Sequence, residues 1–193
     1  MKLDVRPLTP DRWPDLETLF GSRGCSVARG CWCMFYRRSG AQSAPQGVRR
    51  ADFNRRQLRA LVDSGTSPGL IGYRGRVPVG WISLGPREQY QKLARSPVMK
   101  PVDDQAVWSI VCFVVPAAYR RQGVAAALLA RGIAWARKQG VRMLEAYPVA
   151  NARTVRDDSL WFGTASMFER AGFTEVARRK PTRPVVRKSL RRS

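Results

Sequence analysis

The sequence contains no histidine, and its acidic residues are scarce. Fourteen aspartates and glutamates stand against 35 lysines and arginines in 193 residues, which gives a formal net charge of +21 at pH 7. Without histidine, a Ser-His-Asp triad, a histidine general base and a histidine metal ligand are all excluded. The chemistry must be one that works without imidazole, such as acyl transfer from an already activated thioester to an amine.

Long apolar runs are also absent. No run approaches the roughly 20 residues that a membrane-spanning helix needs, and the first residues, MKLDVRPLTPDRW, lack the apolar core of a signal peptide. We therefore expect a cytoplasmic protein that makes no membrane contact, as a monomer or an oligomer. The length favours a single domain over residues 1–193.

The positive charge makes nucleic acid a possible partner, because a field of this sign attracts anions. The C-terminal stretch 178–193 carries eight basic residues and no acidic one. It is either part of such an interface or a solvated edge strand and tail.

Cysteines are few and unevenly placed. Cys25, Cys31 and Cys33 crowd together, and Cys112 lies inside an apolar run. A C-x-C spacing without histidine does not suit zinc, so we expect no metal site. Disulfides are also not expected in a cytoplasmic chain. We interpret Cys112 as a core residue, with attack on a thioester as the alternative.

Periodicity and turn residues predict a mixed α+β chain. Helices are predicted over 12–20, 48–62, 123–139 and 160–171, and loops over 21–40, 85–104 and 148–158. Strands are predicted over 3–6, 70–73, 77–84, 106–115, 141–147, 173–177 and 185–190.

The segment WSIVCFVVPAAYRRQGVA, residues 108–125, is the most informative. An apolar strand ends at Pro116, and Arg120–Ala125 opens an alanine-rich helix. The first N–H groups of a helix lack internal partners and carry the positive end of its dipole. Gly123 permits close approach of the backbone, and Arg120 and Arg121 add charge. The segment therefore predicts a phosphate or pyrophosphate site, although it matches neither a P-loop nor a dinucleotide fingerprint.

Two motifs together resemble the GNAT superfamily of N-acetyltransferases: R-x-x-G-x-A at Arg120–Ala125 and SMFERAGF at Ser166–Phe173. The resemblance covers roughly residues 105–190, the cofactor-binding half. It implies a GNAT-like α+β fold, with a mixed, mostly antiparallel sheet and helices on both faces. It also implies an acyltransferase that moves an acetyl group from acetyl-CoA directly to an amine acceptor.

Two rival functions remain open at this stage. One is an enzyme that acetylates aminoacyl-tRNA or protein, and therefore a macromolecular rather than a small-molecule amine. The other is a catalytically impaired module that binds coenzyme A or nucleic acid.

The resemblance also implies where the ligands bind. Backbone groups of residues 110–115, including Phe113, Val114 and Val115, would hold the pantetheine arm. The pyrophosphate would be held by Arg120, Arg121, Gln122, Gly123, Val124, Ala125 and Ala126. The family places the acceptor near the first helices. There Trp32, Met34 and Tyr36 either line the acceptor groove or pack in the core.

Two catalytic roles are harder to assign. The resemblance places Phe168 where many relatives carry a tyrosine acid, and phenylalanine has no proton to donate. We expect Ser166 to replace it, with water or Tyr147 as alternatives. For the base we expect Glu145, a carboxylate in an apolar strand, where partial burial would raise its pKa. Glu145 is otherwise a half-exposed residue paired with arginine. Asp157 and Asp158 are the next candidates, and these three carboxylates together with Glu88 are the ones expected near the groove that receives the amine.

Overall fold

The computed structural model describes residues 3–39, 43–150 and 160–190. Within these residues the strands form one seven-stranded sheet in the order β1-β2-β3-β4-β5-β7-β6. The β4–β5 pair is parallel and the other neighbouring pairs are antiparallel, which confirms the mixed, mostly antiparallel sheet. The strands are β1 (Asp4–Pro7), β2 (Gly69–Arg74), β3 (Val77–Pro86), β4 (Trp108–Val114), β5 (Met143–Ala146), β6 (Thr174–Ala177) and β7 (Val185–Ser189).

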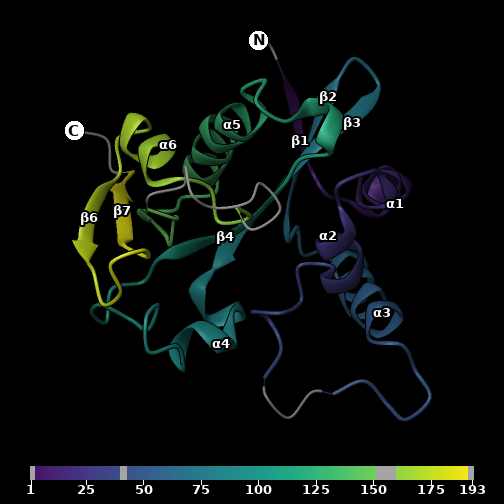
Figure 1. Cartoon of the computed structure of the whole chain (residues 1–193), viewed down its shortest axis with the longest axis horizontal. Helices are drawn as coiled ribbons and strands as arrows, with labels where there is room; N and C mark the ends of the chain where they lie inside the picture. The colour runs from purple at the N-terminus through teal and green to yellow at the C-terminus, as the bar shows by residue number, and fades with distance from the viewer. Residues whose placement is uncertain (1–2, 40–42, 151–159, 191–193) are drawn as a thin grey trace.

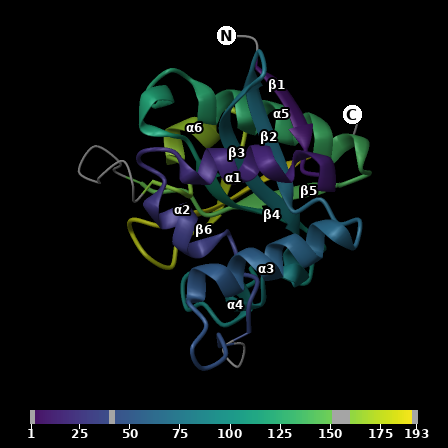
Figure 2. The same ribbon diagram turned by 90° about the vertical axis from the view of Figure 1, so that its right-hand side faces the viewer.

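Helices cover both faces of this sheet. Figure 1 shows α5 and α6 on one side of the sheet and α1, α2 and α3 on the other, and Figure 2 shows α1 crossing in front of the strands. Among the described residues, every helix is too short or too polar to cross a membrane. The α-helices are α1 (Trp13–Gly21), α2 (Ser26–Cys31), α3 (Arg50–Asp63), α4 (Gln91–Ala94), α5 (Val124–Lys138) and α6 (Ala165–Arg170).

A hydrophobic core on each face of the sheet holds these layers together. Successive side chains of a strand point to opposite faces, so Leu70 and Ile82 pack in the core that α5 covers. Their neighbours Ile71 and Trp81 pack in the core beneath α1 and α3. All four side chains are at most 1% exposed. The central strands of the sheet are therefore covered on both faces.

Local sequence explains the hairpin and the long helix. Gly75, at φ 62°, occupies the two-residue turn between Arg74 and Val77, where a positive φ suits the twist of the strands. Helix α5 begins after Gly123, ends near Gly140, and carries Arg137 and Lys138 in its last turn, where the dipole favours cations.

Three predicted segments need correction. The predicted loop 21–40 contains α2, a helix of six residues that is too short for a clear apolar period. The predicted loop 85–104 contains the end of β3, a 3-10 turn at Arg87–Gln89, and α4. The predicted helix 160–171 begins only at Ala165, because the side chain of Thr164 caps it by accepting from the N–H of Met167.

The middle of the sheet is irregular. The register between β3 and β4 shifts between Ser83 and Leu84, whose partners are Cys112 and Ile110, so Val111 is an extra residue. The parallel pairing of β4 with β5 stops at Ile110. The bulge and the early end of pairing separate the second half of β4 from β5, and bulges often mark functional sites.

Candidate functional site

A pocket of about 560 Å³ opens at the place where β4 and β5 separate. Its walls come from α2, from Cys33, Phe35 and Tyr36, from the end of β4, from the loop into α5, and from residues around the start of α6. It therefore joins the N-terminus of α5 at one end to the α2 region at the other. Among the described residues that line it, none is a carboxylate.

The α5 end of the pocket has the unpaired backbone amides and the open space that the predicted anion site requires. The first intrahelical bond joins the N–H of Ala127 to the carbonyl of Gly123, so the preceding amides point out of the helix. Gly123 has φ 76°, and a Cβ added there would meet no described atom within 4 Å. Arg121, at φ 58°, is also left-handed. Left-handed residues in such a loop turn successive N–H groups toward one concavity.

Two backbone carbonyls hold the side chain of Arg120. Its Nη2 donates to the carbonyl of Gly24 at 2.6 Å, and its Nε donates to the carbonyl of Val115 at 3.1 Å. The guanidinium therefore ties the segment before α2 to the end of β4. Arg120 also lines the pocket, so these two bonds fix part of the pocket wall.

The exposed edge of β4 already has a partner. Phe113 donates its N–H to the carbonyl of Trp161 at 2.6 Å. Phe113, Val114 and Val115 all line the pocket, as do Arg120, Arg121, Gly123, Val124, Ala125 and Ala126 of the predicted anion loop. Gln122 is the predicted loop residue that does not line it. Its amide nitrogen donates to the carbonyl of Ala118 at 2.7 Å, within the loop.

The predicted acceptor residues divide between the pocket and the core. Tyr36 lines the pocket beside Phe35. Trp32 and Met34 do not line it: they are 6% and 5% exposed and pack in the core beneath α1. Trp32 stacks on Trp13 at a centroid distance of 5.6 Å. The packing therefore favours the interpretation that Trp32 and Met34 are core residues.

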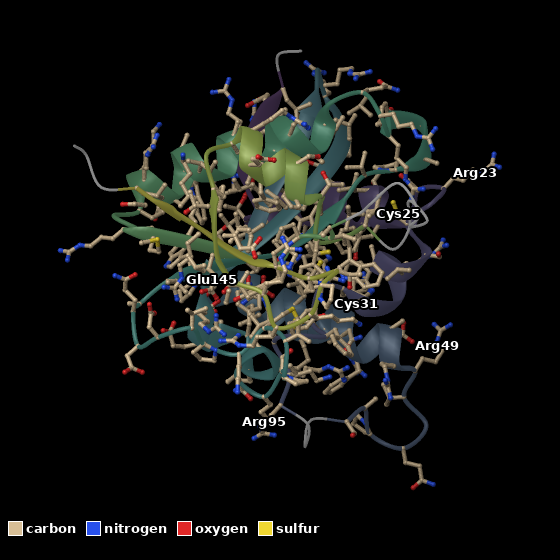
Figure 3. The ribbon with its side chains drawn as sticks, turned by 60° about the vertical axis from the view of Figure 1, so that its left-hand side comes forward. Arg23, Cys25, Cys31, Arg49, Arg95 and Glu145 are labelled. Atoms are coloured by element: carbon tan, nitrogen blue, oxygen red, sulfur yellow. The ribbon has the colours of Figure 1, made fainter. Side chains whose placement is uncertain are left out.

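Glu145 lies away from the pocket and is fully enclosed. Its Oε2 accepts from Arg187 Nε at 2.8 Å, and its Oε1 accepts from Tyr147 at 2.6 Å and from Arg87. Figure 3 shows Glu145 well apart from Cys25 and Cys31, which line the pocket. The expectation of a partly buried carboxylate facing the acceptor is not what the structure shows, because both oxygens are held in an interior ion-pair network.

Neither of the proposed acids, Ser166 and Tyr147, lines the pocket. Ser166 is exposed, and its Oγ lies 3.3 Å from Thr164 Oγ1. Tyr147 is fully buried, and burial together with the charge of Glu145 raises its pKa well above the usual value. Phe168 is fully buried against Phe113 and Phe173. Asp157 and Asp158 lie outside the described residues, and Glu88 does not line the pocket.

The sequence interpretation missed how the cysteines converge. Cys25, Cys31, Cys33 and Cys112 all line the pocket, although 79 residues separate Cys33 from Cys112. The crowding of three cysteines near one apolar loop was the available signal. No cluster of metal-ligating residues occurs in the part of the chain that the structure describes.

Comparisons with known proteins agree with this geometry. The model of the acetyltransferase (GNAT) family matches residues 34–156. No curated protein matches the chain. A PaiA N-acetyltransferase from Thermoplasma acidophilum, solved with coenzyme A, is 14% identical with a TM-score of 0.54, over 98% of this chain and 100% of that one.

Two further structures are similar. An acetyltransferase from Thermus thermophilus is 18% identical with a TM-score of 0.55, over 98% of each chain. A GNAT-family acetyltransferase from Listeria monocytogenes is 12% identical with a TM-score of 0.57, over 97% of this chain and 95% of that one. At these identities the similarity shows the fold alone. The family model spans most of the chain, and the chain therefore belongs to the acetyltransferase (GNAT) family, whose members are acyltransferases that use acetyl-CoA.

Proposed function

We propose that the protein transfers an acetyl group directly from acetyl-CoA to the nitrogen of an amine. The observation that carries this proposal is the continuity of the pocket. One cavity joins the α5 end to an end beside Phe35 and Tyr36, and between them it passes the half of β4 that extends beyond the pairing with β5. Donor and acceptor can therefore meet in one enclosed space, as direct transfer requires.

The residues present fit coenzyme A. The open space at Gly123 lets a pyrophosphate approach the amides of Val124–Ala126. The charges of Arg120 and Arg121 lie on the same loop. The pantetheine arm, which carries amide groups, suits the unpaired half of β4 once Trp161 releases the N–H of Phe113.

A backbone N–H of β4 could activate the thioester. A β4 N–H directed into the pocket would donate to the thioester oxygen and stabilise the negative charge that develops there during attack. The surrounding side chains are mostly apolar, so this hydrogen bond is stronger than it would be in water. A thiolate is a good leaving group because a free thiol has a pKa of about 8.5. The presence of Phe168 instead of a tyrosine is therefore compatible with turnover.

The cellular setting that we propose is the cytoplasm. All four cysteines are unpaired. Free thiols persist in the reducing cytoplasm and tend to be oxidised outside it.

The test is acetyl transfer by the pure protein. Acetyl-CoA is incubated with a panel of free amino acids, polyamines, peptides with a free N-terminus and aminoacyl-tRNA, and thiol release and acetylated products are measured. We expect amine-dependent thiol release with one acetyl group on the acceptor nitrogen. Acetyl-CoA binding without transfer to any amine would favour the impaired module. Transfer to aminoacyl-tRNA alone, weakened by salt, would assign a role to the positive charge.

A further inference from the structure

The end of the pocket where the acceptor would bind carries exposed apolar side chains. Phe35 and Val27 are 47% and 52% exposed, and both line the pocket. Two other large hydrophobic side chains of the described residues are exposed, Val77 and Val176, and neither lines the pocket. Apolar surface that is exposed at the edge of a cavity is typical of a ligand site. This end of the pocket therefore suits an amine with an apolar body.

Three aromatic rings form a row at the same end. The ring of Phe35 meets that of Tyr36 edge to face, with the centroids 4.9 Å apart, and the ring of Tyr36 lies 5.4 Å from that of Phe162. Phe35 and Tyr36 line the pocket, whereas Phe162 is buried and does not line it. Phe35 is the most exposed ring of the three, so the row leads from the interior to the solvent.

A lysine is held over the outermost ring of this row. Lys92, in α4, places its Nζ 3.8 Å from the centroid of the Phe35 ring, where the ring face attracts a cation. Its backbone N–H donates to the carbonyl of Tyr36 at 3.1 Å, so α4 is attached to the pocket wall at this residue. Two contacts therefore fix the ammonium at the outer end of the aromatic row.

This ammonium lacks a counterion among the described residues. No carboxylate of those residues forms an ion pair with Lys92. Partial burial, followed by the charges of Arg38 and Arg50, lowers the pKa of Lys92. A cation that is partly desolvated and lies near like charges is stabilised when an anion binds beside it. The position of Lys92 therefore favours an anionic group on the ligand.

A second cation lies at the inner end of the row. The guanidinium carbon of Arg183 is 4.6 Å from the ring centroid of Phe162, and its Nη1 donates to the backbone carbonyl of Tyr147 at 3.0 Å. In the part of the chain that the structure describes, Arg183 forms no ion pair either, and no residue that lines the pocket is a carboxylate. A second amino group on the acceptor would therefore be repelled at both ends of the row.

We propose that the acceptor is a small amine whose apolar body packs against Phe35 and Tyr36, and whose carboxylate, at the end away from the nitrogen, binds the ammonium of Lys92. This inference rests on the proposed acetyl transfer and narrows its acceptor. The reacting nitrogen is then directed inward, toward the end of β4 that lines the pocket. Attraction at Lys92 selects an anionic acceptor, and repulsion by Lys92 and Arg183 rejects a polyamine.

The experiment compares three probes of similar shape. They are para-(aminomethyl)benzoate, para-methylbenzylamine and para-(aminomethyl)benzylamine, which carry a carboxylate, a methyl group and an ammonium opposite the reacting nitrogen. The readouts are kcat and KM for acetyl transfer to each probe, at low and at physiological salt. We expect wild type to prefer the carboxylate probe to the methyl probe by about tenfold in kcat/KM, because a hydrogen bond between charged groups is the stronger kind. The ammonium probe should react most slowly, and added salt should reduce the preference.

Two substitutions of Lys92 separate its charge from its packing. Lys92→Met keeps an apolar stem over Phe35 and should lose most of the preference for the carboxylate probe through a higher KM. Lys92→Arg keeps the charge and should keep the preference. Lys138→Met is the matched control, because Lys138 ends α5 at the opposite end from the pocket, and it should show the wild-type ratio.

The apolar wall is tested in the same way. Phe35→Ala should raise KM for all three probes. Val77→Ala is its control, because Val77 is equally an exposed apolar residue and does not line the pocket. Calorimetric binding of coenzyme A to each variant reports that the protein has folded.

Equal kcat/KM for the three probes in wild type would overturn the assigned acceptor class while leaving acetyl transfer intact. So would a preference for the ammonium probe, a preference for the carboxylate probe that survives in Lys92→Met, or transfer confined to other amines. Absence of transfer by wild type to every amine would instead defeat the proposed function, and with it this inference.

Discussion

Phe113 donates its backbone N–H to the carbonyl oxygen of Trp161 across 2.6 Å, where β4 and β5 have separated. The edge of β4 is thus closed by the chain itself, at the position where we place the pantetheine arm. The carbonyl of Trp161 thus satisfies the N–H of Phe113, which would otherwise lack a hydrogen-bond partner. Binding of the donor would exchange this internal bond for one to the ligand, so the environment of Trp161 must change.

This exchange predicts a fluorescence change at Trp161. Coenzyme A should alter the tryptophan emission of wild type, and Trp161→Phe should lose most of that response, because Trp161 lines the pocket. Trp135→Phe is the control, since Trp135 packs on Trp108 at 5.4 Å and does not line the pocket. Equal responses in the two variants would place the ligand away from β4.

Gly123 tests the anion site. Gly123→Ala and Gly140→Ala both place a Cβ at positive φ, at the two ends of α5, and neither Cβ meets a described atom. We expect each to cost about 1–2 kcal/mol in the free energy of unfolding. Only Gly123→Ala should also weaken coenzyme A, by about tenfold or 1.4 kcal/mol, because its Cβ enters the space of the pyrophosphate. Calorimetry on both variants, compared with denaturant titration, separates the two effects. Equal affinities would remove the pyrophosphate from this loop.

Glu145→Gln tests the role of the buried carboxylate. The change leaves Arg187 and Arg87 without their interior counterion, and removing one member of such a pair typically costs about 3–5 kcal/mol. We expect a large loss in the free energy of unfolding, measured in denaturant. The remaining folded enzyme should retain the acidic limb of its pH profile. Glu175→Gln, in an exposed pair with Arg178, should change little. A stable Glu145→Gln protein that lacks the acidic limb would restore Glu145 as the base.

The Arg187–Asp103 pair predicts an acid-dependent loss of stability. Two guanidinium nitrogens of Arg187 donate to the two oxygens of Asp103 at 2.7 and 2.9 Å, and these bonds lower the pKa of Asp103. Because the folded pKa is the lower one, the stabilisation is present above the unfolded pKa of about 3.9 and is lost as the pH falls through the folded value. Asp103→Asn should therefore reduce stability near neutral pH and flatten its acid dependence. Thermal melts of this variant and of Asp104→Asn, across the acid range, would check it. Parallel curves for wild type and Asp103→Asn would contradict it.

Much of the fold was predictable because its signals are local. The turn at Gly75, the start of α5 after Gly123 and the stop at Gly140 each follow from a residue that can adopt positive φ. Helix α2 was not predicted because six residues are too few to establish a helical period. The predicted start of α6 was several residues too early. Thr164 caps this helix by accepting from the N–H of Met167, and that bond is visible only in the structure.

The sequence by itself determined that histidine chemistry is absent, and it predicted that a strand, an arginine-containing loop and a helix N-terminus follow one another. The sequence could not determine which carboxylates are held in ion pairs and which are available to act as a base. Glu145 looked available in a chain with 29 arginines, but folding brings Arg87 and Arg187 to it from 58 and 42 residues away. Cys33 and Cys112, which are 79 residues apart in the sequence, likewise come to line one pocket only in the folded chain. Only the tertiary structure decided these matters, because the charge state and reach of a buried group depend on the partners that packing places around it.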